Sequence, residues 1–376
     1  MILGDLGARV IKIERPQVGD DTREWRPPTW NGRSSLFLAT NRNKESVALD
    51  IDSAQGAEAI RRLAAKADIV VESFRGGSLD KKGFGFKDLS RINPRLVYCS
   101  LSAFGANGPN SDRPGYDALI QAYSGIMSIT GEKGRPAVRV GASIIDMGAA
   151  HWAAIGILAA LRLRDQTGEA QLVQTSLLET GVAWMSYFAA GYFADGTIPG
   201  ASGTRHSAMA PYEDFAARDE VIYIAAPNQA LFVSLCKTLG IEEAISDPRF
   251  RTNSDRLAHR DELHQRIEDR LLTEDGATWE RLLLERGIPC SRLQTIDQVV
   301  NDPQVAALKL IREFPHPDIA NHRLVDHPIS YNGTRSFRTD PAPDLGQHTE
   351  EVLRSIGLDP GEMESADRPG DKVGAP

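Results

Sequence analysis

The sequence predicts an α/β fold in which a large domain, built on a doubly wound parallel sheet, receives an inserted, smaller α+β domain. Three observations support this prediction. The 376 residues are enough for two domains. Residues 8–105 alternate short apolar runs with helical segments, the pattern of a parallel sheet covered on both faces. Residues 194–211, rich in Gly, Pro, Ser and Thr, then precede a second group of amphipathic helices.

The N-terminal elements follow one another in a regular order. Residues 1–7 have the pattern of the end of a helix, with Gly7 just beyond it. Apolar runs ended by turn residues then predict four strands, at Ala8–Pro16, Ser46–Ile51, Asp68–Phe74 and Arg95–Gly105. Ser53 is a suitable cap for a helix over 54–67. Because a doubly wound unit normally has a strand before its first helix, the sequence begins one strand later than expected.

The later elements include one long apolar helix. Met147–Asp165 is apolar on all sides, so we predict that this helix is buried. Arg162 and Arg164 lie in its last turn and Gly168 follows, as is typical of a helix C-terminus. The remaining predicted elements are a strand at Val221–Ala226, helices at Leu231–Leu239, Arg260–Leu272 and Ala277–Arg286, and an extended stretch at His322–Gly333.

These elements define the expected domain boundaries. The predicted segments are a large domain over 1–190, a linker and active-site loop over 191–205, a small domain over 206–295, a return to the large domain over 296–360, and a disordered tail over 361–376. The tail is predicted from its polar composition, which offers little apolar surface to bury.

Composition excludes several classes of protein. A formal net charge of -8 argues against a nucleic-acid-binding protein. No apolar run of about 18 residues is free of polar interruption, and the N-terminus does not have the pattern of a signal peptide, so we expect no membrane span. The three cysteines, Cys99, Cys236 and Cys290, do not form a disulfide framework and suit the reducing cytoplasm. We therefore expect a cytoplasmic protein.

Common catalytic motifs are absent. The sequence has no P-loop, no G-x-S-x-G, no H-E-x-x-H and no G-x-G-x-x-G, although the strand that contains Glu14 resembles the acidic-residue strand of a dinucleotide-binding fold. None of the eight histidines has zinc-ligand spacing, so no metal site is expected. His151 lies five residues after Asp146, and a histidine in an apolar helix is more often structural than catalytic.

Asp146 interrupts the apolar stretch Val138–Leu161 and has two interpretations. Aspartate is a favoured N-cap residue, and Asp146 directly precedes the predicted long helix. In the same place, free N–H groups and the helix dipole would keep a carboxylate ionised, ready to attack an activated acyl group such as a thioester. Small residues around it would allow close approach of backbone and substrate: Gly141, Ala142, Ser143, Gly148 and Ala149.

Many stretches resemble the class III CoA-transferases, the formyl-CoA transferase and carnitine CoA-transferase group. They cover nearly the whole chain in the family's order: Leu6–Arg23, Asn41–Asp50, Ala67–Gly85, Asn93–Pro109, Gly115–Gly131, Asp146–Gln171, Gly287–Val305 and Leu345–Leu353. The resemblance implies that Asp146 is the nucleophile, which forms an aspartyl–acyl anhydride and then an aspartyl-CoA thioester. It also implies that no metal or redox cofactor takes part.

The resemblance further implies a CoA site and an assembly. The residues that correspond to the family's CoA contacts are Arg15, Leu49, Asp50, Ile51, Asp52, Ser73, Phe74, Arg75, Lys81, Pro114, Gly115, Tyr116 and Asp117. The expected assembly is an interlocked homodimer of ring-shaped subunits. Of the glycine-rich loop that covers the active site in formyl-CoA transferase, only Gly200 and Gly203 are present here, which argues against oxalate as the substrate.

Two alternatives remain beside the transferase. The α-methylacyl-CoA racemase branch of the superfamily has a G-H-D motif, whereas this chain has G-Y-D with Tyr116, and a tyrosine is a poor base for an α-proton at neutral pH. An inactive CoA-binding protein would follow from the absence of a first strand. Acyl-CoA and small carboxylic acids, with dicarboxylates such as succinate first, are the expected substrates.

Overall fold

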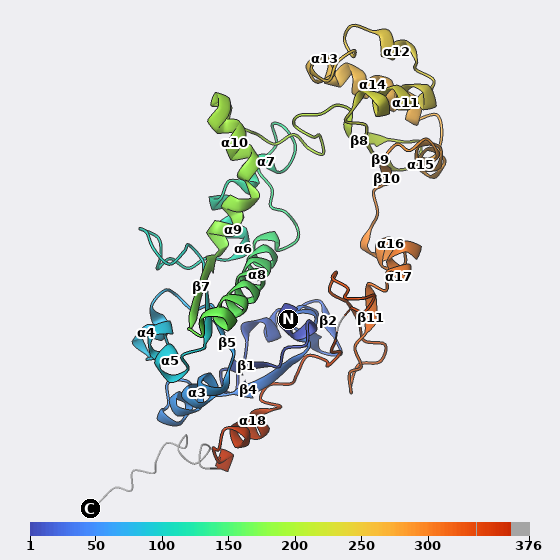
Figure 1. Cartoon of the computed structure of the whole chain (residues 1–376). Coiled ribbons are helices and arrows are strands. Elements are labelled where there is room, and N and C mark those ends of the chain that lie inside the picture. The colour runs from blue at the N-terminus through green and yellow to red at the C-terminus, as the bar shows by residue number, and fades with distance from the viewer. Residues whose placement is uncertain (336, 362–376) are drawn as a thin grey trace, which may run out of the picture. The chain divides into compact units, whose positions relative to one another are not determined.

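The computed structural model describes residues 1–335 and 337–361, so the predicted tail lies almost entirely outside the described residues. The chain forms two compact units, and Figure 1 labels most of their helices and strands. Unit 1 contains Met1–Tyr123, Ala142–Trp184 and the described residues from Asp302 onward. Unit 2 contains Ser124–Gly141 and Met185–Asn301. The compact units therefore divide at 184/185 and 301/302, and residues 124–141 join unit 2, which no signal in the sequence indicated.

Unit 1 is built on parallel strands. Strand β1 (Val10–Glu14) pairs with β4 (Lys44–Ala48), and β6 (Val97–Ser102) pairs with β5 (Ile69–Glu72) and β7 (Gln171–Ser176) on its two sides. All of these pairs are parallel, as the alternation of strands and helices predicts.

Helices cover these strands through separate apolar clusters. Helix α3 (Ala54–Lys66) begins with Ser53, whose Oγ accepts the amide of Gly56, so the predicted cap is confirmed. Helix α18 (Thr349–Ser355), from the end of the chain, packs on β4 through Val352 and Val47. The shorter elements of unit 1 are α1 (Ile2–Asp5), η1 (Asp21–Glu24), β2 (Thr29–Trp30), β3 (Arg33–Ser34), α2 (Ser35–Asn41), α4 (Ser78–Lys81), α5 (Phe86–Ile92), α17 (Pro303–Ala307), β11 (Ile311–Glu313) and β12 (Arg323–Val325).

Helix α8 (Ile144–Thr167) begins three residues earlier than predicted and is only half buried in this chain. Its inner face packs on β6 and β7 through Ala153 and Ile157, whereas Met147 and Ile155 are each 56% exposed. The prediction of a fully buried helix is wrong for the single chain, because an all-round apolar pattern does not reveal which face meets the sheet. Among the described helices, α8 alone is long and apolar enough to cross a membrane, but a core helix of a globular domain has the same composition.

Unit 2 contains an antiparallel sheet in the order β10 (Cys290–Arg292), β9 (Val221–Ala225), β8 (Tyr212–Ala216). The predicted amphipathic helices are confirmed as α11 (Gln229–Leu239), α14 (Arg260–Leu271) and α15 (Gly276–Glu285), and their apolar faces form one core with the sheet. The other helices are α7 (Ile126–Ile129), α10 (Ser186–Asp195), α12 (Glu243–Ser246), α13 (Asn253–Ala258) and α16 (Ile296–Val300).

The boundaries of β4 and α10 also differ from the sequence-based prediction. Strand β4 ends at Ala48 rather than Ile51, because the chain then forms a turn. In this turn the amide of Ser53 donates to the carbonyl oxygen of Asp50. Helix α10 extends to Asp195 and thus into the predicted linker, which is non-helical only from Gly196.

Candidate active site

The N-terminus of α8 is capped by a residue from another helix. Asp117, the first residue of α6 (Asp117–Tyr123), accepts the amides of Ile145 and Asp146 on Oδ2, at 2.8 and 3.2 Å. Its Oδ1 accepts the side-chain amide of Gln121 at 2.5 Å. Asp117 is 6% exposed, so this carboxylate is a buried cap that satisfies two of the free donors of the first turn.

Asp146 is therefore not the cap of α8. It lies within the first turn, after Ile144 and Ile145, and the cap interpretation from the sequence is wrong. The residue is exposed, and among the described residues its carboxylate accepts no hydrogen bond. The pKa of Asp146 is raised above its ordinary value. The larger cause is desolvation of the carboxylate by the surrounding protein, and the smaller is the negative charge of Asp117. The expected stabilisation of its charge by helix amides is absent, because Asp117 uses those amides.

Glycines near this turn allow side chains of neighbouring segments to pack closely. A Cβ on Gly148 would lie 2.8 Å from the Thr180 methyl group and 2.9 Å from the Trp184 ring on α9 (Leu177–Trp184), so only glycine fits without displacement. A Cβ on Gly115 would lie 2.9 Å from Ala103 Cβ. Gly148 therefore allows the side chains of α9 to pack closely on α8, and the predicted approach of a substrate stays a prediction.

Two further residues that the sequence analysis considered, His151 and Tyr116, have exposed side chains. The ring of His151 is exposed, and its Nδ1 lies 2.6 Å from the carbonyl oxygen of Met147, in the same helix. Tyr116 is 71% exposed, next to the buried Asp117, and Pro114 is the residue before Gly115 at the start of this segment. Tyr116 is thus accessible to a ligand, whereas the side chain of Asp117 is occupied.

The predicted CoA contacts at the strand ends fall into two adjacent groups. Because β1 and β4 are parallel, Arg15 and Leu49 follow paired ends of neighbouring strands. The guanidinium of Arg15 contacts Asp21 and the Gly19 carbonyl, and Leu49 is buried in the core. An ion pair between Asp52 and Lys82 joins the turn after β4 to the segment at the end of α4.

The remaining residues predicted to contact CoA differ in exposure and in whether their side chains already have partners in the protein. Ile51 packs against the core, and Asp50 accepts the amide of Asp52 at 2.9 Å. Ser73, Phe74 and Arg75 follow β5 and are exposed. In the described part of the chain, the side chains of Arg75 and Lys81 form no ion pair, so both cations are available to a phosphate.

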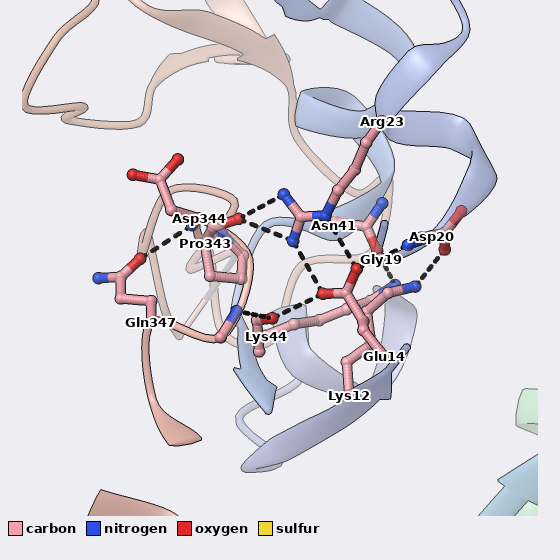
Figure 2. Close-up of polar contacts among 12 residues, drawn as sticks. Lys12, Glu14, Gly19, Asp20, Arg23, Asn41, Lys44, Pro343, Asp344 and Gln347 are labelled. Atoms are coloured by element: carbon pink, nitrogen blue, oxygen red, sulfur yellow. Dashed lines mark hydrogen bonds and ion pairs between the residues drawn. The ribbon is translucent and has the colours of Figure 1, made fainter. Parts of the chain in front are cut away.

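Glu14 is the centre of a buried polar network rather than a ribose-binding residue (Figure 2). Its carboxylate accepts Nε and Nη2 of Arg23, both at 2.8 Å, and Oγ of Ser46 at 2.7 Å. Arg23 also donates to the carbonyl of Pro343, from the returning chain. Since all of these contacts are internal and Glu14 is 4% exposed, the resemblance of its strand to a dinucleotide-binding strand has no functional meaning.

The capping role of Asp117 and its support by Gln121 were not predicted from the sequence. The i, i+4 spacing of these two residues on α6 was visible, but the partner helix begins 27 residues later than Asp117. Among residues 1–335 and 337–361, the structure contains no group of three or more His, Cys, Asp or Glu side chains that could hold a metal ion.

Comparison with known proteins defines the class to which this fold and site belong. A family model described as CoA-transferase family III matches residues 1–349. The chain belongs to CoA-transferase family III.

Individual relatives agree with this assignment. The chain is 37% identical to succinyl-CoA:glutarate CoA-transferase of Mus musculus, over 95% of this chain and 82% of that protein. It is 38% identical to acetyl-CoA:oxalate CoA-transferase of Acetobacter aceti, over 82% of this chain and 80% of that protein. A crystal structure of a CAIB/BAIF family protein from Brucella suis matches with a TM-score of 0.83 and 35% identity, covering 94% of this chain and 93% of that one. The protein is a CoA-transferase, which moves CoA from an acyl-CoA donor to a carboxylic acid, and the racemase alternative is not supported.

Proposed function

We propose that this enzyme exchanges CoA between small dicarboxylic acids, with Asp146 as its nucleophile. The substrate class is supported by relatives named for succinyl-CoA and glutarate, including succinate–glutarate CoA-transferase of Agrobacterium fabrum at 34% identity over 94% of this chain and 90% of that protein. The single observation that carries the role of Asp146 is its exposed carboxylate in the first turn of α8, without a hydrogen-bond partner in the described chain.

The proposed reaction has four steps. A carboxylate oxygen of Asp146 attacks the thioester carbonyl, the C–S bond breaks, and CoA leaves as its thiolate. The thiolate then attacks the aspartyl carbonyl of the mixed anhydride, which releases the donor acid and forms an aspartyl-CoA thioester. The acceptor carboxylate attacks this thioester and expels the thiolate, giving a second anhydride. Attack of the thiolate on the acceptor acyl carbon forms the new acyl-CoA and restores Asp146, so no metal or redox cofactor is needed.

CoA is expected to bind along the carboxyl ends of the parallel strands. Arg75 and Lys81 would contact its phosphates, and Phe74, which is 49% exposed, offers a face for the adenine ring. Arg15 follows β1, at the carboxyl end of the two-stranded sheet, and its charge is shared with Asp21.

We further propose a cytoplasmic homodimer. In unit 1, Met147, Ile155 and Leu158 expose an apolar face of α8, and in unit 2 Phe193 on α10 is 81% exposed. Exposed clusters of large apolar side chains often mark interfaces between proteins. The three cysteines are free thiols, as a reducing compartment requires. A monomer in sedimentation at micromolar concentration would contradict the dimer.

The test of the proposed function compares the native enzyme with Asp146→Asn. Because Asp117 caps α8, the Asp146→Asn variant should fold normally and still bind CoA. The amide side chain of this variant cannot form the anhydride. We expect the native enzyme to transfer CoA among succinate, glutarate and related acids and to gain the mass of CoA when incubated with acyl-CoA. Hydroxylamine should then leave a hydroxamate at Asp146. An Asn variant that retains activity, shown by mass spectrometry to be free of deamidation, would refute the mechanism.

A further inference from the structure

We propose that Asp117 is a positioning residue for the nucleophile: by capping α8 from a different helix, it holds the backbone of Asp146 and leaves the Asp146 carboxylate free to react. This inference rests on the proposed role of Asp146. The interaction of Asp117 with Asp146 is through the backbone amide, so Asp117 itself does not touch the reacting atoms.

The cap has an unusual origin. The free donors at the start of a helix are normally satisfied by the side chain of the residue just before it, but the side chain of Ser143 forms no cap hydrogen bond. Asp117 supplies the acceptor instead, from a position 28 residues before Ile145 in the sequence. A charged acceptor forms hydrogen bonds roughly twice as strong as a neutral one. The first turn of α8 is thus tied to α6 by two charge-assisted bonds.

The carboxylate of Asp117 is itself held in place by its surroundings. Asp117 is nine-tenths buried, and the amide of Gln121, one turn further along α6, fixes its second oxygen. The carboxylate therefore has little freedom to rotate away from the amides of Ile145 and Asp146. Groups that hold a reacting residue in this way control catalysis through small displacements, because a shift of about 1 Å can reduce a rate by about 100-fold.

The cap also determines what the Asp146 side chain can do. An aspartate in the first turn of a helix can turn back toward the free amides of its own helix. Here Asp117 occupies the amides of Ile145 and Asp146, and the Asp146 carboxylate remains exposed, without an acceptor bond in the described chain. The lone pairs needed for attack on a thioester are therefore not engaged by the protein.

The chain offers a closely matched control. Asp302 caps α17 with one oxygen that accepts the amides of Gln304 and Val305, at 2.7 and 3.2 Å, nearly the distances found at Asp117. Helix α17 carries no proposed catalytic or CoA-binding residue. Asp302 is the N-cap residue of its own helix, so Asp302→Ala removes a local cap with nearly the same hydrogen-bond distances without affecting the nucleophile.

The experiment measures how fast the folded enzyme gains CoA at Asp146 in a single turnover, by mass spectrometry, together with steady-state kinetics and urea unfolding. For Asp117→Ala we expect adduct formation and kcat to fall about 10–100-fold with little change in KM for acyl-CoA, because the nucleophile is displaced. Asp117→Asn keeps an oxygen that accepts the same two backbone amides, while its NH2 group takes the place of the oxygen that accepts from Gln121, so the Gln121 amide has to turn over. We expect this variant to remain within about 3-fold of the native rate. Asp302→Ala should lose some stability but react at the native rate.

Each outcome is decisive. An Asp117→Ala enzyme that acquires CoA at the native rate would overturn the positioning role, as would an Asn variant as slow as the Ala variant. If Asp117→Ala does not fold, Asp117→Glu replaces it: it keeps the charge but moves the carboxylate by one methylene, and it should react more slowly than Asp117→Asn. The reverse order would overturn the proposal. Absence of the adduct in the native enzyme would instead refute the role of Asp146.

Discussion

The buried ion pair between Glu14 and Arg23 gives a prediction about the stability of unit 1 (Figure 2). The side chain of Glu14 is 1% exposed and that of Arg23 is 16% exposed. Glu14→Gln has nearly the same shape but turns one accepting oxygen into an amide that faces the donors of Arg23. The substitution leaves a largely buried guanidinium with a reduced counter-charge, and breaking such a pair costs about 3–5 kcal/mol. Because the Gln side chain keeps one oxygen that can accept a hydrogen bond from Arg23, we expect a loss at the lower end of this range, about 3 kcal/mol at pH 7.

The matched control is Glu45→Gln on the neighbouring strand. Glu45 also binds an arginine through both oxygens, with Arg9 Nη2 2.8 Å from Oε2, but Arg9 is 50% exposed. Pairs of this kind contribute less than about 1 kcal/mol, since water screens them. Urea unfolding followed by tryptophan fluorescence suits the comparison, because four of the five tryptophans, Trp25, Trp30, Trp152 and Trp184, lie in unit 1. Equal losses for the two variants would refute the argument from burial.

The same pair should make stability depend on pH. Burial alone would raise the pKa of Glu14, but hydrogen bonds from Arg23, Ser46 and the Asp20 amide outweigh it and lower the pKa from 4.5. The stabilisation is therefore complete above the unfolded pKa of 4.5 and is lost as the pH falls through the lower, folded value. The difference in unfolding free energy between native and Glu14→Gln should stay constant from pH 7 down to about 5.5 and shrink below 4.5. A difference that grows on acidification would contradict this assignment.

Two further substitutions test packing and charge. Gly148→Ala should lower stability by about 1 kcal/mol in urea unfolding, because its Cβ would lie 2.8 Å from Thr180; the control Gly191→Ala, with nothing within 4 Å, should gain about 0.5–1 kcal/mol. Equal effects of the two substitutions would show that α8 and α9 can move apart. His264 donates a hydrogen bond to the buried Glu213, and this bond raises the pKa of His264 above 6.5. The stabilisation from this contact is therefore complete below pH 6.5 and is lost as the pH rises through the pKa of His264 in the folded protein. Native protein should therefore lose stability relative to His264→Gln between pH 6 and 8. If the unfolding free energies of the two proteins changed in parallel with pH, the charged contact between His264 and Glu213 would be excluded.

Much of the local structure was accessible from the sequence because it depends on neighbouring residues. Strand β9 and helix α11 follow from apolar runs and their periodicity, and the cap at Ser53 from one hydroxyl at the right position. The ordered stretches that resemble the CoA-transferases predicted the family, which the match over residues 1–349 confirms. Asp146 was identified as the candidate nucleophile in the same way, although that role stays a prediction.

Only the tertiary structure assigned the cap of α8 to Asp117 instead of Asp146. The deciding hydrogen bonds join residues 28 and 29 positions apart, on helices whose relative placement no local pattern encodes. The contact between Arg23 and Pro343 spans 320 positions, for the same reason. The exposed face of α8 is a further case, since its apolar residues surround the helix and packing on β6 and β7 alone selects which of them are buried. Residue types and spacing determine which groups are available, whereas their partners, burial and pKa values depend on distances that exist only once the chain has folded.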